Sequence, residues 1–317
     1  PGAHEGKGLG NQFLDDARQA DMLIHVVDIS GSTDLQGQHV NVGSHDPRED
    51  IKFVEEEFDY WFKQILEREW QKLSKEIEKK STKLADGITD RFSGLGVKVH
   101  EVHEILQSLG LLTKKPTEWN DSDITKFAQM LRKKIKPMLI AANKADLCKD
   151  LKIANEIHRT REIVNCSAET ELLLKKAAKA NLIDYIPGNE KFVINKNVDI
   201  SPQQKEALNL VENVLLKLNS TGIQTALNSA VFRVLKLIVV FPVEDETKLS
   251  NKNGEVLPDA KLLSENATAK NLAETIHQDI AKGFLFAIDA KTKQRIGADH
   301  QLKNGDVIKI VSSLSRG

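Results

Sequence analysis

Three polar side chains stand within the four positions 143–146, and their types suit recognition of a flat ligand that forms hydrogen bonds. Asn143 offers an amide, Lys144 an ammonium group and Asp146 a carboxylate. A carboxylate can accept the two N–H donors on one edge of guanine, whereas adenine lacks that pair and would leave the carboxylate unpaired. The tetrapeptide therefore favours a guanine nucleotide over an adenine nucleotide.

The residues before this tetrapeptide predict the element that carries it. The apolar run at 137–142 is typical of a buried parallel strand, which delivers side chains to the ligand edge of an open α/β sheet. A run at 22–28, rich in β-branched residues, predicts another core strand. A third short run at 163–166 predicts a strand that ends at the pair Ser167-Ala168.

Residues 47–135 carry helical patterns instead. Asp46 before Pro47, with Glu49 behind them, predicts a capped helix start. Apolar residues then recur at spacings of three and four, as in coiled-coil-like helices. The series are Ile51, Val54, Phe58, Trp61 and Ile65; Val99, Val102, Leu106 and Leu109; and Ile124, Phe127, Leu131 and Ile135. The sequence therefore predicts a helical module inserted between two strands.

The last third of the chain predicts a separate domain. Ser201, Pro202 and Gln204 indicate a capped helix that ends near Gly222. Beyond it, strand-like runs at 235–242, 284–288 and 307–311 accompany a helix expected at 268–280. Short strands around one helix predict a compact α+β domain.

Composition bounds the class of protein. The chain of 317 residues is 40% hydrophobic and 29% charged with a net charge of -1, as in a soluble globular protein of two or three domains. No run approaches the ~18 apolar residues of a membrane span, and no signal sequence is seen. The two cysteines, Cys148 and Cys166, exclude a disulfide framework and fit a reducing compartment. We expect a cytoplasmic protein with no membrane partner.

With these motifs in place, the chain resembles the Obg-like superfamily of GTPases, most closely the archaeal-type branch of the YchF-related proteins. The resemblance rests on the glycine-rich block 2–14, the Asn-Lys-x-Asp motif at 143–146 and the block 302–310, which is similar to a TGS domain. It implies an α/β, P-loop NTPase-like but partial G domain with a helical insertion and a C-terminal β-grasp domain. The expected boundaries are 1–46 and 136–185 for the partial G domain, 47–135 for the insertion, 186–232 for a connector and 233–317 for the TGS domain.

The resemblance also implies roles for site residues. It assigns Asn143 and Asp146 to the guanine base, Lys144 to the flank of the base, and the backbone amides of Ser167 and Ala168 to guanine O6. Proteins of the YchF type proper have a changed motif and favour ATP, so the retained carboxylate here favours GTP and GDP. The glycine-rich block would form a switch segment that senses the γ-phosphate. Its expected members are Gly2, Gly6, Gly8 and Gly10.

The chain departs from the family in its phosphate-binding residues. A P-loop requires Gly-x-x-x-x-Gly-Lys-[Ser/Thr], and the sequence contains no such match. The first switch and the Asp-x-x-Gly motif are absent too. By comparison with the family, we expect an N-terminal stretch that carries these motifs and the Mg²⁺ ligands to be missing. Catalytic residues stay unassigned, and no metal site is expected from His100 and His103 because they have no acidic or cysteine partner at ligand spacing.

Two functions are compatible with these observations. The first is a GTP-binding protein whose complete form hydrolyses GTP to GDP and phosphate as a ribosome-associated switch, with little or no hydrolysis by this chain. The second is an RNA- or ribosome-binding module with a vestigial nucleotide fold. A basic stripe would serve it, although interleaved acidic residues favour an ordinary solvated helix face. The stripe comprises Lys72, Lys75, Lys79 and Lys83, and the acidic residues are Glu76 and Glu78.

Overall fold

The computed structural model describes residues 16–68, 70–80 and 83–314. The chain divides into two compact units, Pro1–Ala230 and Val231–Gly317, called here the N-terminal unit and the C-terminal unit. Both combine helices and strands, so the expected α/β class with a C-terminal α+β domain is confirmed.

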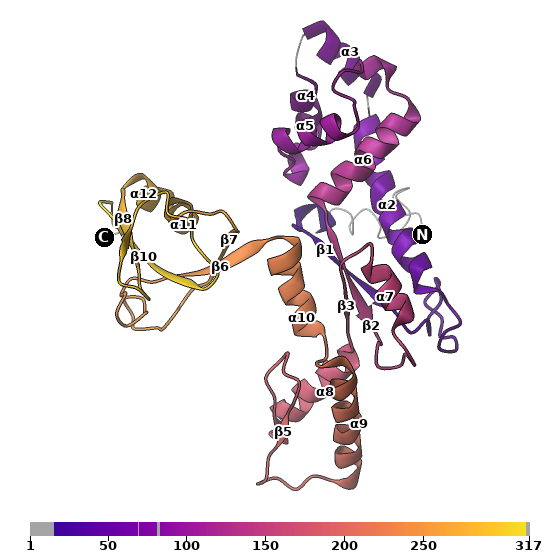
Figure 1. The fold of residues 1–317 in the computed structure, drawn as a ribbon, viewed down its shortest axis with the longest axis vertical. Helices are drawn as coiled ribbons and strands as arrows, with labels where there is room; N and C mark the ends of the chain where they lie inside the picture. Colours follow the sequence, from indigo (N-terminus) through magenta and orange to yellow (C-terminus); the bar gives the residue numbers. More distant parts are fainter. Residues whose placement is uncertain (1–15, 69, 81–82, 315–317) are drawn as a thin grey trace. The chain divides into compact units, whose positions relative to one another are not determined.

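A parallel sheet of three strands lies in the N-terminal unit (Figure 1). Its order is β1 (Leu23–Asp28), β2 (Met138–Asn143), β3 (Ile163–Asn165), and all three strands were expected from their apolar runs. The central strand buries Leu139 and Ala142 completely, as expected for a parallel strand covered on both faces. Helix α7 (Lys152–His158) connects β2 to β3.

A helical module is inserted between β1 and β2. It contains α2 (Pro47–Glu67), α3 (Trp70–Lys80), α4 (Leu84–Arg91), α5 (Val99–Ser108) and α6 (Asp121–Ile135), with single 3₁₀ turns at Ser93–Leu95 and Pro116–Glu118. Asp46 caps α2 as expected, since its side chain accepts from the Arg48 amide and Pro47 opens the helix. A coiled-coil supercoil in this module stays a prediction.

Aromatic side chains dominate the core of this module. Phe62 and Phe127 are fully buried, and Trp61, Trp70 and Trp119 are almost so. The rings of Trp70 and Trp119 lie 4.9 Å apart, centre to centre. Aromatic pairs at such distances stabilise a core beyond the area that they bury.

A smaller helical layer follows β3. It contains α8 (Ala168–Lys179), the paired strands β4 (Ile183–Asp184) and β5 (Val193–Ile194), α9 (Pro202–Leu218) and α10 (Ile223–Asn228). Ser201 and Gln204 form the expected capping box of α9. The helix ends at Leu218, earlier than expected near Gly222, because Asn219 adopts a left-handed conformation at φ 62° and terminates it.

The C-terminal unit is a mixed sheet packed by two short helices. The strand order is β7 (Lys261–Ser264), β6 (Leu237–Pro242), β10 (Asp306–Ser312), β8 (Phe284–Asp289), β9 (Arg295–Ile296). The single helix expected at 268–280 was wrong. His277 takes an extended conformation there and separates α11 (Ala269–Ile276) from α12 (Gln278–Lys282).

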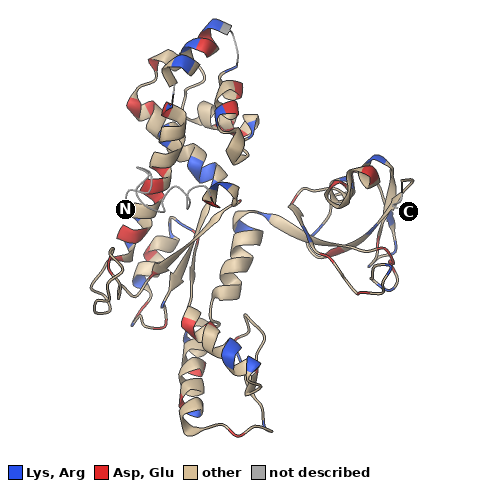
Figure 2. Ribbon diagram, turned by 180° about the vertical axis from the view of Figure 1, so that it is seen from behind, with Lys and Arg blue, Asp and Glu red and all other residues tan. Residues whose placement is uncertain are grey.

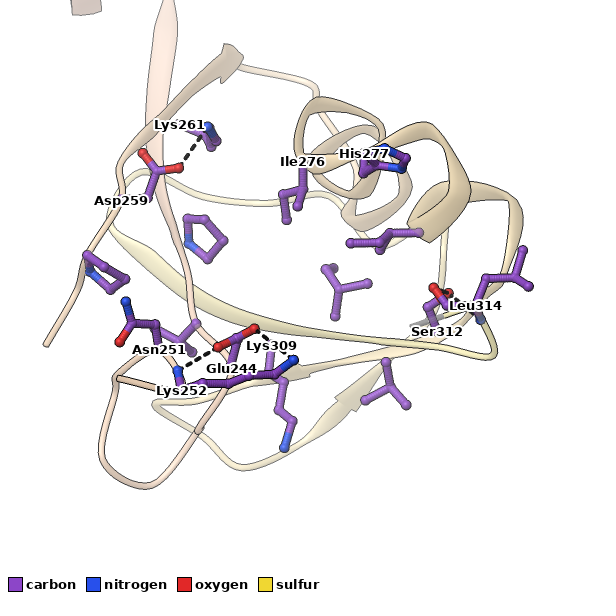
Figure 3. A pocket seen from close by; sticks show the side chains of 16 residues that line it. Glu244, Asn251, Lys252, Asp259, Lys261, Ile276, His277, Lys309, Ser312 and Leu314 are labelled. Carbon is purple, nitrogen blue, oxygen red and sulfur yellow. Dashed lines mark hydrogen bonds and ion pairs between the residues drawn. The ribbon is translucent and has the colours of Figure 1, made fainter. Parts of the chain in front are cut away.

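A cavity of about 520 Å³ lies within the C-terminal unit (Figure 3). Its apolar wall includes Ile276 and Ile310. Two of its three lysines are closely paired: Lys261 with Asp259 at 2.7 Å and Lys309 with Glu246 at 2.6 Å. The cavity therefore presents no uncompensated positive charge from these two side chains.

Among the described residues, no helix has the length and apolar character that a membrane span requires.

Candidate functional site

The strands of the N-terminal unit end side by side at one edge of the sheet. Asp28, the last residue of β1, lies opposite Asn143, the last of β2. In the next pair, Ala142 lies opposite Asn165 at the end of β3. Because carboxyl ends of parallel strands share one edge, polar residues distant in sequence meet there.

The structure brings the two predicted base-reading segments into direct contact. The Asn143 side-chain oxygen accepts a hydrogen bond of 2.9 Å from the backbone amide of Ala168. The Ser167 amide is also engaged, since it donates to the Thr221 carbonyl at 2.8 Å. A carbonyl oxygen of a ligand that approached this turn would therefore share the Ala168 N–H with Asn143.

Lys144 is anchored at its tip by a cluster that the sequence analysis missed. Its backbone is left-handed at φ 60°, and its ammonium group donates to the Asp28 carboxylate at 2.7 Å. It also lies 3.1 Å from the Ser32 hydroxyl and 3.0 Å from the Thr33 hydroxyl. These contacts hold the tip of Lys144.

Asp28 is the centre of this cluster. Its carboxylate accepts hydrogen bonds from the hydroxyls of Ser30, Ser32 and Thr33 in addition to Lys144. Burial acts to raise its pKa, but the bonds from Lys144 and the hydroxyls outweigh burial and hold the pKa of Asp28 well below its ordinary value. The group therefore stays ionised in mildly acidic solution. One signal could have found it: Asp28 ends a predicted strand, as Asn143 does.

We expect Asp28→Asn to lower the free energy of unfolding by about 1.5 kcal/mol at pH 7, since Lys144 loses a charged acceptor. A carboxylate with a depressed pKa stabilises above its unfolded-state pKa and loses this contribution as pH falls toward its folded-state pKa. The difference between variant and wild type should thus stay constant above about pH 5 and shrink below about pH 4. Urea unfolding followed by circular dichroism measures the free energy of unfolding of variant and wild type at each pH. Asp199→Asn, at an exposed position, is the control, and an equal effect there would contradict the prediction.

Asp146 has a different environment from Asp28. Within the described ranges, its carboxylate makes no hydrogen bond and no ion pair. Its backbone carbonyl, in contrast, accepts from the Lys217 ammonium group at 3.0 Å. The backbone of Asp146 is thus held while its carboxylate remains available to a ligand with N–H donors.

A further set of residues, which the sequence analysis did not identify, supports both the Asn143–Asp146 segment and the Ser167-Ala168 turn. Lys217, at the end of α9, also donates to the carbonyls of Ala145 and Cys148. Thr221, fully buried, donates to Glu171 on α8 at 2.6 Å. Gly222 lies directly on the end of β3, at φ 79°. No local pattern marks these residues, because they act through the fold on motifs far away in sequence.

A cavity beside the predicted site covers only part of it. It measures about 340 Å³ and is lined by Asn143, Lys144 and Asp28, but not by Asp146, Ser167 or Ala168. Asp34 and Asp50 also line it, so carboxylates outnumber its one lysine. Such a surface disfavours a phosphate group.

Both cysteines lie beside the site, and neither environment activates a thiol. Burial raises the pKa of Cys166 to about 12. Burial also raises the pKa of Cys148, although Lys217 acts in the opposite direction. A raised pKa lowers the fraction of thiolate, which is the reactive form.

The predicted switch residues Gly2, Gly6, Gly8 and Gly10 lie outside the described residues.

Comparison with known proteins assigns these features to recognised domains. The family model described as "Obg-like GTPase YGR210-like, G4 motif-containing domain" matches residues 141–245. The TGS domain model matches residues 254–312. The expected C-terminal TGS domain is therefore confirmed.

Relatives extend the similarity over nearly the whole chain. A GTP-binding protein of Methanocaldococcus jannaschii is 40% identical over 99% of this chain and 78% of its own length. One of Schizosaccharomyces pombe is 33% identical over 87% of this chain and 69% of its own length.

Solved structures agree with the relatives. The crystal structure of a GTP-binding protein from Pyrococcus horikoshii OT3 is 42% identical, with a TM-score of 0.77 over 95% of this chain and 81% of that one. The YchF GTPase of Schizosaccharomyces pombe, at 16% identity and a TM-score of 0.52 over 96% of this chain and 75% of that one, shares the fold.

Proposed function

We propose that this chain, which belongs to the YchF/Obg-like family of GTP-binding proteins with a C-terminal TGS domain, recognises the guanine base of GTP and GDP through Asn143, Lys144, Asp146 and the Ser167-Ala168 turn, in which Ala168 offers the amide. One observation carries the proposal. Asn143 contacts the Ser167-Ala168 turn at 2.9 Å, while the nearby Asp146 carboxylate is uncommitted within the described part of the chain.

The proposed contacts follow from the chemistry of the base. Asp146 would accept from the two N–H donors on one edge of guanine, and the Ala168 amide would donate to O6. The stem of Lys144, held at its tip by Asp28, would cover one face of the ring. Adenine places an amino group where guanine has O6 and lacks the donor pair, so its binding would leave polar groups of the site unpaired.

Ligand-observed saturation-transfer NMR tests this proposal with the 317-residue chain. We expect GMP and GDP each to give a signal, and we expect excess GDP to remove the signal of GMP. AMP and ADP at the same concentrations should give none. Equal signals from the guanine and adenine nucleotides would refute base recognition.

We further propose that the chain by itself hydrolyses little or no GTP, whereas a protein of this family with the phosphate-binding motifs converts GTP to GDP and phosphate with Mg²⁺. The support is the absence of a P-loop match from the sequence. The hydroxyl that would hold Mg²⁺ in a P-loop protein belongs to the same unmatched motif. Phosphate release above that of a heat-treated sample, after removal of contaminating GTPases, would contradict the proposal.

A second candidate function is binding to RNA or the ribosome. Lys72, Lys75 and Lys79 are exposed on α3, and Lys83 is exposed just before α4. Figure 2 colours lysine and arginine positions blue along the ribbon. Glu76 and Glu78 interleave with them, although Glu78 is engaged by the Thr117 hydroxyl at 2.7 Å. Ribosome binding that weakens with salt and is lost on changing all four lysines to glutamate would support this function. Binding that survives the four changes would remove the stripe from it.

A further inference from the structure

The stretch Lys217–Gly222, called here the clamp segment, contacts both segments of the proposed base site. It comprises the end of α9 and the turn that leads into α10. Its residues lie about seventy positions after the Asn-Lys-x-Asp motif; Lys217 and Asp146 are 71 apart. The inference below rests on the proposed function.

Lys217 holds the first base-reading segment through its backbone. Its ammonium group donates to the carbonyls of Ala145 at 3.4 Å, Asp146 at 3.0 Å and Cys148 at 2.5 Å. An ammonium group has three N–H donors, and three carbonyls converge on this one. The peptide groups on both sides of the Asp146 side chain are thereby fixed by one remote residue.

The direction of these bonds is informative. A lysine in the last turn of a helix ordinarily interacts with the free carbonyls of its own helix end. Lys217 instead donates to carbonyls of the loop after β2. Asn219, in its left-handed conformation, ends α9. Lys217 therefore stabilises the loop after β2 and does not cap its own helix.

The other end of the clamp segment holds the second base-reading segment. The Thr221 carbonyl accepts from the Ser167 amide at 2.8 Å, and the Thr221 hydroxyl donates to the buried Glu171 carboxylate. Gly222 packs on the carbonyl of Asn165, so closely that a Cβ atom there would lie 1.9 Å from that oxygen. One six-residue stretch thus fixes both sides of the proposed site.

We infer that Lys217 and Thr221 are positioning residues for guanine recognition, and that the clamp segment sets the distance between the Asp146 loop and the Ser167-Ala168 turn. By linkage, a guanine ligand that binds the ordered loops stabilises the clamp segment to the same extent. The segment continues directly into α10 and the π-helical turn Ser229–Val234, which reaches the C-terminal unit along the chain. Guanine affinity is therefore controlled from residues outside the motif.

The test uses Lys217→Met and Lys217→Arg in the 317-residue chain. Lys205→Met, at an exposed position in the first turns of the same helix, is the matched control. Two quantities are measured: the rate at which a neutral maleimide labels the Cys148 thiolate, read by mass spectrometry of peptides and corrected through its pH dependence for the change in pKa that loss of Lys217 causes, and saturation-transfer binding of GMP against AMP. Cys166, 1% exposed, reports overall folding in the same samples.

We expect Lys217→Met to raise the labelling rate of Cys148 about tenfold, which corresponds to ~1.4 kcal/mol of lost local order. Cys166 labelling should stay unchanged, GMP binding should weaken about tenfold, and Lys217→Arg should restore most of both effects. The Lys205→Met variant should match the wild type. A selective change in GMP binding without a change at Cys166 separates positioning from a general loss of stability.

Either of two results would refute the proposal that Lys217 positions the Asp146 loop. One is an unchanged Cys148 rate in Lys217→Met, and the other is equal loss of protection at Cys148 and Cys166. If the wild type binds no guanine nucleotide, base recognition fails. In that case the proposed role of the clamp segment in guanine recognition is refuted as well. The Cys148 labelling rate still tests whether Lys217 orders the Asp146 loop.

Discussion

Asp146→Asn should change the ratio of guanine to xanthine binding by at least about 100-fold, in favour of xanthine. Guanine presents an N–H and an amino group to the Asp146 carboxylate, whereas xanthine has a carbonyl oxygen in place of the amino group. An asparagine amide can donate to that carbonyl and accept from the neighbouring N–H, but it clashes with the amino group of guanine. Competition between GMP and XMP in saturation-transfer NMR measures the ratio.

Asp150→Asn provides the control for this change. Asp150 lies on the same loop, is exposed, and bonds to the amide of Lys152. We expect its substitution to leave the preference for GMP intact. A preference for guanine that survived Asp146→Asn would show that another group reads the base.

Gly222→Ala should cost about 3 kcal/mol in the stability of the N-terminal unit. An added Cβ would lie 1.9 Å from the carbonyl oxygen of Asn165 and 3.0 Å from the Cα of Cys166, and both atoms belong to the backbone of the site. In addition, φ of 79° is unfavourable for alanine. The urea concentration at which Cys166 becomes reactive measures the loss, because this thiol is buried in the folded protein.

Gly37→Ala separates steric overlap from backbone strain. Gly37 has the same φ of 79°, but no atom lies within 4 Å of a Cβ built there. Its substitution should cost only about 1 kcal/mol. Equal losses in the two variants would assign the whole effect to backbone conformation and contradict the close approach to Asn165.

The strands and the polar residues at their ends were predictable from local pattern. The run before Asn143 is long enough and apolar enough to indicate a buried strand, and a strand end fixes where the next side chains lie. The same rule applied to Asp28 would have identified the partner of Lys144. The contact between Asn143 and Ala168 then follows from the parallel order of β2 and β3.

The remaining features depend on tertiary structure. Lys217 reads as one more basic residue in the last turn of a helix, and nothing in its neighbourhood indicates a loop 71 positions earlier. The break at His277 was missed because the apolar pattern of 268–280 suits a continuous helix, whereas the extended backbone of His277 ends it. Helix ends are set by single residues whose conformation depends on packing, so local pattern locates them poorly.

The position of the aromatic core has a practical consequence. All three tryptophans of the chain, Trp61, Trp70 and Trp119, lie in the helical module between β1 and β2. Intrinsic fluorescence excited in the tryptophan band therefore observes this module selectively and does not directly observe the TGS domain. A change in that emission on addition of GDP would mean that the module senses the nucleotide, and the protein carries the optical probe for this measurement without any label.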